Sequence, residues 1–217
     1  MKPQKLFKYI SAFFFPCRCP FCGKVITPDE ICCNQCSPKI KTNISKHFIG
    51  NSWLCTSPFK YTDLPKQAVL RLKFNDCGQI APLMAEYMTA SVKESFSDYS
   101  FDIVTFVPMH KKRKRKSLYN HSKLLAAEIS KNLDVPIASL LVKTKNNSLQ
   151  HRLPSQERIK NVKGVYSVNK KYGKTLKGKT VLLCDDVITT GSTLSECCKV
   201  LEKAGAKDVF CVAFSKA

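Results

Sequence analysis

Two adjacent carboxylates followed by a run of small hydroxyl residues form the most chemically specific segment of this chain. Asp185 and Asp186 follow four apolar residues at 181–184, and Thr-Thr-Gly-Ser-Thr occupies positions 189–193. A helical pattern begins at Ser192. Backbone N–H groups at a helix start have no intrahelical partner, so they attract phosphate. Carboxylate oxygens accept hydrogen bonds from hydroxyl groups and bind divalent cations. The segment therefore predicts a strand, a loop and a helix start that together bind a phosphorylated sugar.

The same residues carry a family resemblance. The sequence Val-Leu-Leu-Cys-Asp-Asp-Val-Ile-Thr-Thr-Gly-Ser-Thr-Leu at 181–194 resembles the phosphoribosyl pyrophosphate (PRPP) signature of type I phosphoribosyltransferases. The resemblance implies that Asp185 and Asp186 bind the ribose hydroxyls, with Mg²⁺ accompanying PRPP. It implies that the 5′-phosphate is held by Thr189, Thr190, Gly191, Ser192 and Thr193. The competing interpretation is an ordinary helix start capped by Ser or Thr, but a cap requires neither two carboxylates nor three hydroxyls.

Cysteine is concentrated near the N-terminus, where six of the twelve cysteines fall between positions 17 and 36. Four of them form two Cys-x2-Cys pairs: Cys19 with Cys22, and Cys33 with Cys36. Two such pairs complete the tetrahedral thiolate site typical of structural Zn²⁺. Using Cys17 or Cys32 as a ligand would break the two-residue spacing, and a metal-free reduced cluster or disulfides are the alternatives. The clustering favours metal and a reducing, cytoplasmic compartment.

A four-cysteine module before a phosphoribosyltransferase-like domain resembles the ComF family of bacterial competence proteins, which are associated with DNA uptake in natural transformation. The segments 58–61, 68–74, 107–108 and 164–166 resemble that family as well. The family's Arg-Gly-Phe-Asn-Gln is replaced here by Lys-Ser-Leu-Tyr-Asn-His at 116–121, which keeps the Asn and loses the Gly and Gln. The resemblance implies action in DNA uptake together with a helicase or recombination mediator.

Charge is strongly unbalanced, with 36 Lys and Arg against 16 Asp and Glu, a formal net charge of +20. Such an excess favours polyanions, although a solvated basic surface explains it equally well. Six consecutive cations could contact pyrophosphate or single-stranded DNA: Lys111, Lys112, Arg113, Lys114, Arg115 and Lys116. No run approaches the ~20 apolar residues of a membrane span, so stable membrane insertion is not expected. Residues 1–16 predict a short amphipathic helix that packs on the body of the protein.

Alternating helices and strands must position these residues. The hydrophobic pattern predicts helices at 64–73, 79–96, 120–132 and 192–204, and strands at 102–108, 137–142, 180–184 and 208–214. This order is typical of a largely parallel sheet covered on both faces, with ligands beyond the carboxyl ends of its strands. We therefore expect an α/β fold, a type I phosphoribosyltransferase-like parallel sheet flanked by helices. Residues 1–56 would form the N-terminal helix and zinc-binding module, and residues 57–217 the phosphoribosyltransferase-like domain.

Three functions are compatible with these features. The first is a PRPP-binding protein of the DNA-uptake pathway, which the charge and the ComF resemblance favour. The second is an active phosphoribosyltransferase of nucleotide or nucleoside metabolism with an unknown acceptor. The third is a scaffold whose zinc module docks a partner. The polar segment 143–161 could form a mobile lid, but no residue pattern identifies an acceptor base or a catalytic residue.

Overall fold

A mixed, mostly parallel sheet forms the centre of the computed structural model, which describes residues 9–10, 12–50, 52–74, 78–110, 119–145 and 162–217. Its strand order is β1 (Ser45–Ile49), β2 (Trp53–Ser57), β8 (Asp208–Lys216), β7 (Thr180–Ile188) and β4 (Ile103–Phe106), with β3 (Phe59–Lys60) also paired to β8. Only the β1–β2 pairing is antiparallel among the described strands of this sheet. The predicted α/β class is therefore confirmed, with one antiparallel edge strand added.

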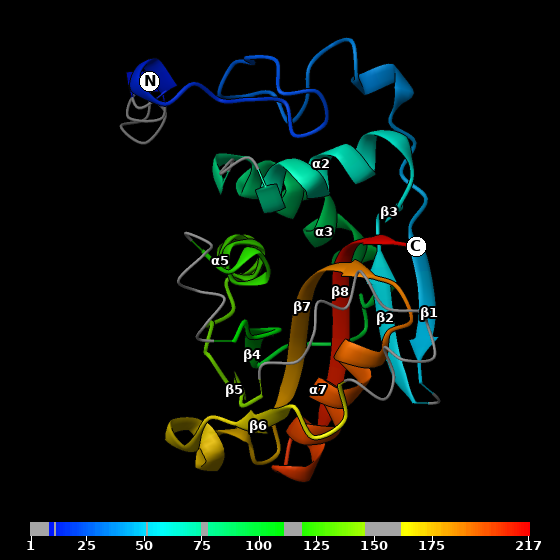
Figure 1. Cartoon of the computed structure of the whole chain (residues 1–217), viewed down its shortest axis with the longest axis vertical. Helices are drawn as coiled ribbons and strands as arrows, with labels where there is room; N and C mark the ends of the chain where they lie inside the picture. Colours follow the sequence, from blue (N-terminus) through cyan, green and yellow to red (C-terminus); the bar gives the residue numbers. More distant parts are fainter. Residues whose placement is uncertain (1–8, 11, 51, 75–77, 111–118, 146–161) are drawn as a thin grey trace.

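Helices cover both faces of the sheet (Figure 1). α2 (Asp63–Phe74), α3 (Ala81–Ser95) and α5 (His121–Leu133) share a core with Val212 and Phe214 of β8. α7 (Ser192–Lys203) shares the opposite core with Cys211 and Ala213 of the same strand. Alternate residues of a strand point to opposite faces of the sheet. A strand that is covered on both faces therefore needs apolar residues at successive positions, as β8 has.

Smaller elements complete the described chain. β5 (Leu141–Lys143) and β6 (Tyr166–Val168) form a separate antiparallel pair. Short 3₁₀ turns occur at η1 (Ser37–Lys39), η2 (Gly78–Ile80) and η4 (Lys170–Leu176). The four predicted helices and the strands at 102–108, 180–184 and 208–214 all have counterparts here. The β1–β2 hairpin pairs into the sheet, and its second strand crosses the predicted boundary between residues 56 and 57. That boundary stays a prediction.

The N-terminal aromatic residues are not packed as the sequence suggested. Residues 9–10 and 12–14 are helical, but Phe13, Phe14 and Phe15 are 84%, 71% and 78% exposed, so this helix does not bury its aromatic side chains on the body of the protein. Phe74, at the end of α2, is also 65% exposed. No helix among the described residues is long and apolar enough to cross a membrane.

Candidate functional site

The two adjacent carboxylates lie where β7 extends beyond its neighbour β4. The register of β4 with β7 ends at Phe106 and Cys184, whereas β7 continues along β8 to Ile188. Asp185 and Asp186 therefore lie at the carboxyl end of a central strand. At this point β7 still pairs with β8, but its pairing with β4 has ended. In Figure 1, β7 and β8 run toward the side of the molecule on which α2 lies. The sequence predicted this position at a strand end, but it did not predict what contacts the carboxylates.

Each aspartate has a partner on a different helix. The Lys73 Nζ atom of α2 lies 2.8 Å from Asp186 Oδ1, and the Asp186 side chain is only 11% exposed. Ser122 of α5 donates from Oγ to Asp185 Oδ1 at 2.8 Å, and the backbone N–H of Asp186 donates to the same oxygen at 2.9 Å. The carboxylate pair is thus held between α2 and α5, two helices that precede β7 in sequence.

Electrostatics distinguish the two members of this acidic pair. Burial, together with the charge of the neighbouring Asp186, raises the pKa of Asp185 to about 7, against the opposing effects of Lys73 and Ser122. Burial alone would lower the pKa of Lys73, but the Asp186 carboxylate reverses this, so that the pKa is raised and the ammonium form is favoured. At neutral pH the site therefore holds a Lys73–Asp186 ion pair beside an Asp185 carboxyl group that is close to its titration midpoint.

The hydroxyl loop forms the turn between β7 and α7. Gly191 has a φ of +71°, and a Cβ there would lie 2.8 Å from Ile49 Cγ2 of β1. Glycine is therefore required both by the left-handed backbone and by the close approach of the β1–β2 hairpin. Thr190 Oγ1 and Ser192 Oγ lie 2.9 Å apart, and the Ser195 N–H donates to the Gly191 carbonyl at 2.8 Å, which starts the helix.

The remaining loop residues lie around this turn. Thr189 and Thr190 are exposed, whereas Ser192 and Thr193 are half-buried. The Thr193 side chain interacts with the Tyr166 hydroxyl, while burial raises the pKa of that tyrosine. The structure thus brings the predicted hydroxyl residues and both aspartates to one end of β7. The six cations at 111–116 lie outside the described residues.

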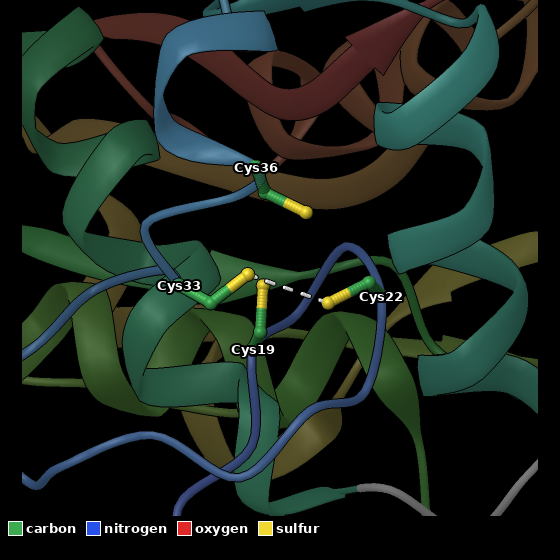
Figure 2. Close-up of side chains that lie close together, drawn as sticks. All are labelled: Cys19, Cys22, Cys33 and Cys36. Atoms are coloured by element: carbon green, nitrogen blue, oxygen red, sulfur yellow. Dashed lines mark hydrogen bonds between the residues drawn. The ribbon is translucent and has the colours of Figure 1, made fainter.

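A separate cluster of four thiols lies near the N-terminus, as Figure 2 shows. The Sγ atoms of Cys19, Cys22, Cys33 and Cys36 all lie within 4.8 Å of one another. A tetrahedral zinc with Zn–S bonds near 2.3 Å requires sulfur–sulfur distances of about 3.8 Å, so this donor set fits the metal. The cluster contains the four cysteines that the Cys-x2-Cys spacing selected, and neither Cys17 nor Cys32 is among them.

Both cysteine pairs are shaped by backbone turns. The Gly23 N–H donates to the Cys19 carbonyl at 2.9 Å, and the Cys36 N–H donates to the Cys33 carbonyl at 3.0 Å. Although burial would raise the pKa of Cys33, the Cys36 backbone and the neighbouring thiols lower it to about 7. A thiolate is the form that binds metal, so Cys33 is suited to be the first ligand to ionise.

α2 connects the cysteine cluster to the carboxylates. Arg71 donates from Nη2 to the Cys22 carbonyl at 2.8 Å, and from Nε to the Phe21 carbonyl at 3.4 Å. Phe21 is fully buried, and its ring lies edge-on to Phe59 with centroids 5.9 Å apart. Two residues beyond Arg71, Lys73 contacts Asp186.

Sequence reasoning missed Lys73, Ser122 and Arg71. Lys73 and Arg71 lie in the segment 68–74, which was noted for its family resemblance, but no sequence pattern indicated a role for them beyond that of basic residues in the last turn of a helix. Asn120 was noted only through the family resemblance. It caps α5 by accepting from the Lys123 N–H, and it donates from Nδ2 to the Val107 carbonyl at 3.1 Å, which fixes α5 to the end of β4.

Comparison with known proteins agrees with this architecture. Residues 119–216 match the family model described as the phosphoribosyl transferase domain. The chain is 30% identical to Competence protein F of Haemophilus influenzae over 145 residues, which cover 65% of this chain and 63% of that protein. It is 25% identical to DNA utilization protein YhgH of Escherichia coli over 196 residues, which cover 88% of this chain and 80% of that one. The chain thus spans somewhat less than two thirds of the Haemophilus relative.

Among solved structures, the phosphoribosylpyrophosphate synthetase of Mycobacterium smegmatis is similar to this chain, with 25% identity, a TM-score of 0.37, and coverage of 61% of this chain and 33% of that one. The mostly parallel sheet and the matched domain define a protein of the type I phosphoribosyltransferase fold. With its preceding four-cysteine cluster, the chain is a homologue of Competence protein F and of DNA utilization protein YhgH.

Proposed function

We propose that this protein binds PRPP at the carboxyl end of β7 and acts in DNA uptake. Asp185 and Asp186 bind the ribose hydroxyls, and the 5′-phosphate is held by Thr189, Thr190, Gly191, Ser192 and Thr193. The observation that supports this most directly is the convergence of the Lys73–Asp186 ion pair and the Thr190–Ser192 turn at one strand end. Mg²⁺ would enter with the pyrophosphate group and neutralise part of its charge.

Titration calorimetry with PRPP and Mg²⁺ tests the ligand. We expect the wild type to bind, and Asp185→Asn/Asp186→Asn to lose at least tenfold in affinity, because each carboxylate that accepts from a ribose hydroxyl is replaced by a weaker acceptor. Asp98→Asn is the matched control, since Asp98 is an exposed aspartate in the loop after α3. An absence of heat in the wild type, or equal binding by the double variant, would overturn the PRPP assignment.

The DNA-uptake role follows the names of the two relatives, which refer to competence and to DNA utilization. Under this proposal the protein is cytoplasmic, contacts single-stranded DNA through the cations at 111–116, and works with a helicase or recombination mediator. A protein that contacts single-stranded phosphates loses affinity with salt, with a log–log slope of about −0.7 per contact. Replacing Lys112 and Lys114 by Gln should flatten that slope by roughly 1.4; an unchanged slope would exclude this segment as the contact.

Zinc binding is the second part of the proposal, and it is supported by the four-thiol geometry. Zinc would be structural, because four protein ligands fill the tetrahedral positions and leave none for substrate. Metal analysis should find about one zinc per chain in the wild type and in Cys17→Ser, and much less in Cys19→Ser. Full retention in Cys19→Ser would refute the ligand assignment.

A further inference from the structure

The ammonium group of Lys73 lies directly against the acidic pair, Asp185 and Asp186. Its Nζ atom is 2.8 Å from Asp186 Oδ1, and the side chain of that aspartate is only 11% exposed. The charge of Asp186 raises the pKa of Lys73 against the opposing effect of burial, which keeps the lysine protonated at neutral pH. A positive charge is therefore fixed beside the acidic pair by the protein itself.

The packing of α2 holds this charge in place. Three apolar residues of the helix are fully buried in the core, and the last of them immediately precedes Lys73: Ala68, Val69 and Leu72. The Lys73 side chain is 29% exposed, whereas Lys131 and Lys207, which form other ion pairs in the described structure, are 69% and 70% exposed. Water and salt therefore screen the Lys73–Asp186 pair less than they screen these surface pairs.

The acidic pair keeps room for hydrogen-bond donors. Asp185 Oδ1 accepts from Ser122 Oγ at 2.8 Å and from the Asp186 N–H at 2.9 Å, and Asp186 Oδ1 faces Lys73. An ionised carboxylate offers about four acceptor positions on its two oxygens. Both side chains can thus accept from further donors while these contacts remain in place.

The two kinds of ligand that an acidic pair can take differ in the charge they require. A hydroxyl group is uncharged, so it needs only a vacant acceptor position. A free divalent cation is held by the negative charge of the carboxylates, and an ammonium group a few ångströms away both cancels part of that charge and repels the cation. The sequence alone is compatible with either ligand, and the position of Lys73 distinguishes between them.

We propose that Lys73 is a specificity-determining residue of this site. As the fixed counter-ion of Asp186, it makes the acidic pair accept hydroxyl groups and exclude a free divalent cation. That these hydroxyls belong to a ribose rests on the proposed function, whereas the exclusion of the cation does not. A divalent cation then depends on an anionic ligand for its entry, because the phosphate oxygens of that ligand supply the charge that Lys73 cancels at the aspartates.

Mn²⁺ in the absence of PRPP is the probe, because carboxylate sites bind it as they bind Mg²⁺ and electron paramagnetic resonance separates free from bound Mn²⁺. We expect Lys73→Met to bind about one Mn²⁺ per chain, at least tenfold more tightly than the wild type. Lys73→Arg keeps the charge and should bind Mn²⁺ as weakly as the wild type. Lys66→Met removes a charge from an exposed position of the same helix and should also match the wild type.

A second substitution locates the site that Lys73→Met creates. Adding Asp186→Asn should abolish the gain in Mn²⁺ affinity, because the carboxylate that Lys73 had neutralised is then absent. Mn²⁺ should also raise the melting temperature of Lys73→Met and leave that of the wild type unchanged. A lysine that served only to stabilise the fold would lower the melting temperature without creating a cation site, and that result would overturn the inference.

The wild type provides a test that does not depend on the folding of any Lys73 variant. Binding of about one Mn²⁺ per chain by the wild type, lost in Asp186→Asn, would overturn the exclusion of the cation. PRPP titrations of the same samples separate this inference from the proposed function. A wild type that binds neither PRPP nor Mn²⁺, beside a Lys73→Met variant that binds Mn²⁺, would retain the role of Lys73 and overturn the function. PRPP binding with equal Mn²⁺ affinity in both proteins would do the reverse.

Discussion

The cysteine cluster and the carboxylate site reach their geometry in opposite ways. The carboxylates are part of a nine-residue strand, and their positions follow from its register with β8. The four thiols lie on loops, where turns within each Cys-x2-Cys pair and a few contacts such as that of Arg71 constrain them. A sheet can hold a binding site without its ligand, whereas converging thiols repel one another once ionised and need a cation. We therefore expect metal to determine the structure of the first region and ligand to leave the second nearly unchanged.

α2 is the element at which the two regions meet. Arg71 donates to the carbonyl groups of Phe21 and Cys22, and Lys73 contacts Asp186. The buried Phe21 extends this connection into the aromatic core around Phe59. The cysteine segment packs against the same core as α2 and α3, so a change in either region can reach the other through this core and through α2.

The largest effect should come from removing a metal ligand. In Cys33→Ser we expect zinc loss and a fall in unfolding free energy of several kcal/mol, because metal-binding energy is folding energy for such a site. Thermal unfolding with and without a chelator measures it, and Cys32→Ser, a neighbouring cysteine outside the cluster, is the control. If chelator leaves the wild-type melting temperature unchanged, metal does not determine the structure of the cysteine region, and the proposed difference between the two regions is wrong.

Gly191→Ala should destabilise the carboxylate region by roughly 1–3 kcal/mol, since it combines left-handed backbone strain with a clash against Ile49. Adding Ile49→Ala should relieve the clash but not the backbone strain. Gly191→Ala should therefore lower the unfolding free energy less in the Ile49→Ala background than in the wild type, but should still lower it. Denaturant unfolding measures both variants. Gly173→Ala, where a Cβ meets nothing within 4 Å, should be close to neutral, and an equal loss there would contradict the role of the close approach.

The raised pKa of Asp185 gives the carboxylate region a pH dependence. The folded carboxyl group keeps its proton up to about pH 7, whereas the unfolded one releases it near the ordinary value of 3.8. Between these values the folded state binds more protons, so this group makes stability fall as pH rises, with no further loss above about 7. Asp185→Asn should remove this contribution, on the order of 2–4 kcal/mol at most.

Urea unfolding of the wild type and of Asp185→Asn at about pH 5.5 and pH 8 isolates this contribution, because other titrating groups are common to both proteins. The stability of the Asn variant relative to the wild type should be greater at the higher pH. A difference that stays constant between the two conditions would show that the Asp185 pKa is not raised.

The smallest effect concerns the contact between the regions. Arg71→Gln removes the two donors to the Cys22 and Phe21 carbonyls and should destabilise by about 1–2 kcal/mol. Zinc content should remain at the wild-type level, because the ligands are untouched. Hydrogen exchange at residues 19–23 should increase while exchange along β7 stays the same. Increased exchange along β7 would show that the Arg71 contacts also stabilise the carboxylate region, which would contradict this prediction.

The sequence alone determined the features that are encoded in contiguous residues. The acidic pair, the hydroxyl loop, the spacing of the four cysteines and the alternation of helices and strands are local patterns, and each predicts its element or cluster from neighbouring residues. Backbone geometry converts such spacing directly into proximity: a Cys-x2-Cys turn brings two thiols together, and a strand followed by a loop places hydroxyls beside a helix start.

Only the tertiary structure decided which distant residues join them. Nothing local distinguishes Lys73 from any other basic residue at a helix end, yet the packing of α2 over the sheet brings it to Asp186. The β1–β2 hairpin is short and half polar, so its sequence showed no strong strand pattern. Its Ile49 nevertheless lies so close to Gly191 that a Cβ there would clash with it. Such contacts depend on how whole elements bury their apolar faces, a property of the complete sheet and its helices that no segment contains by itself.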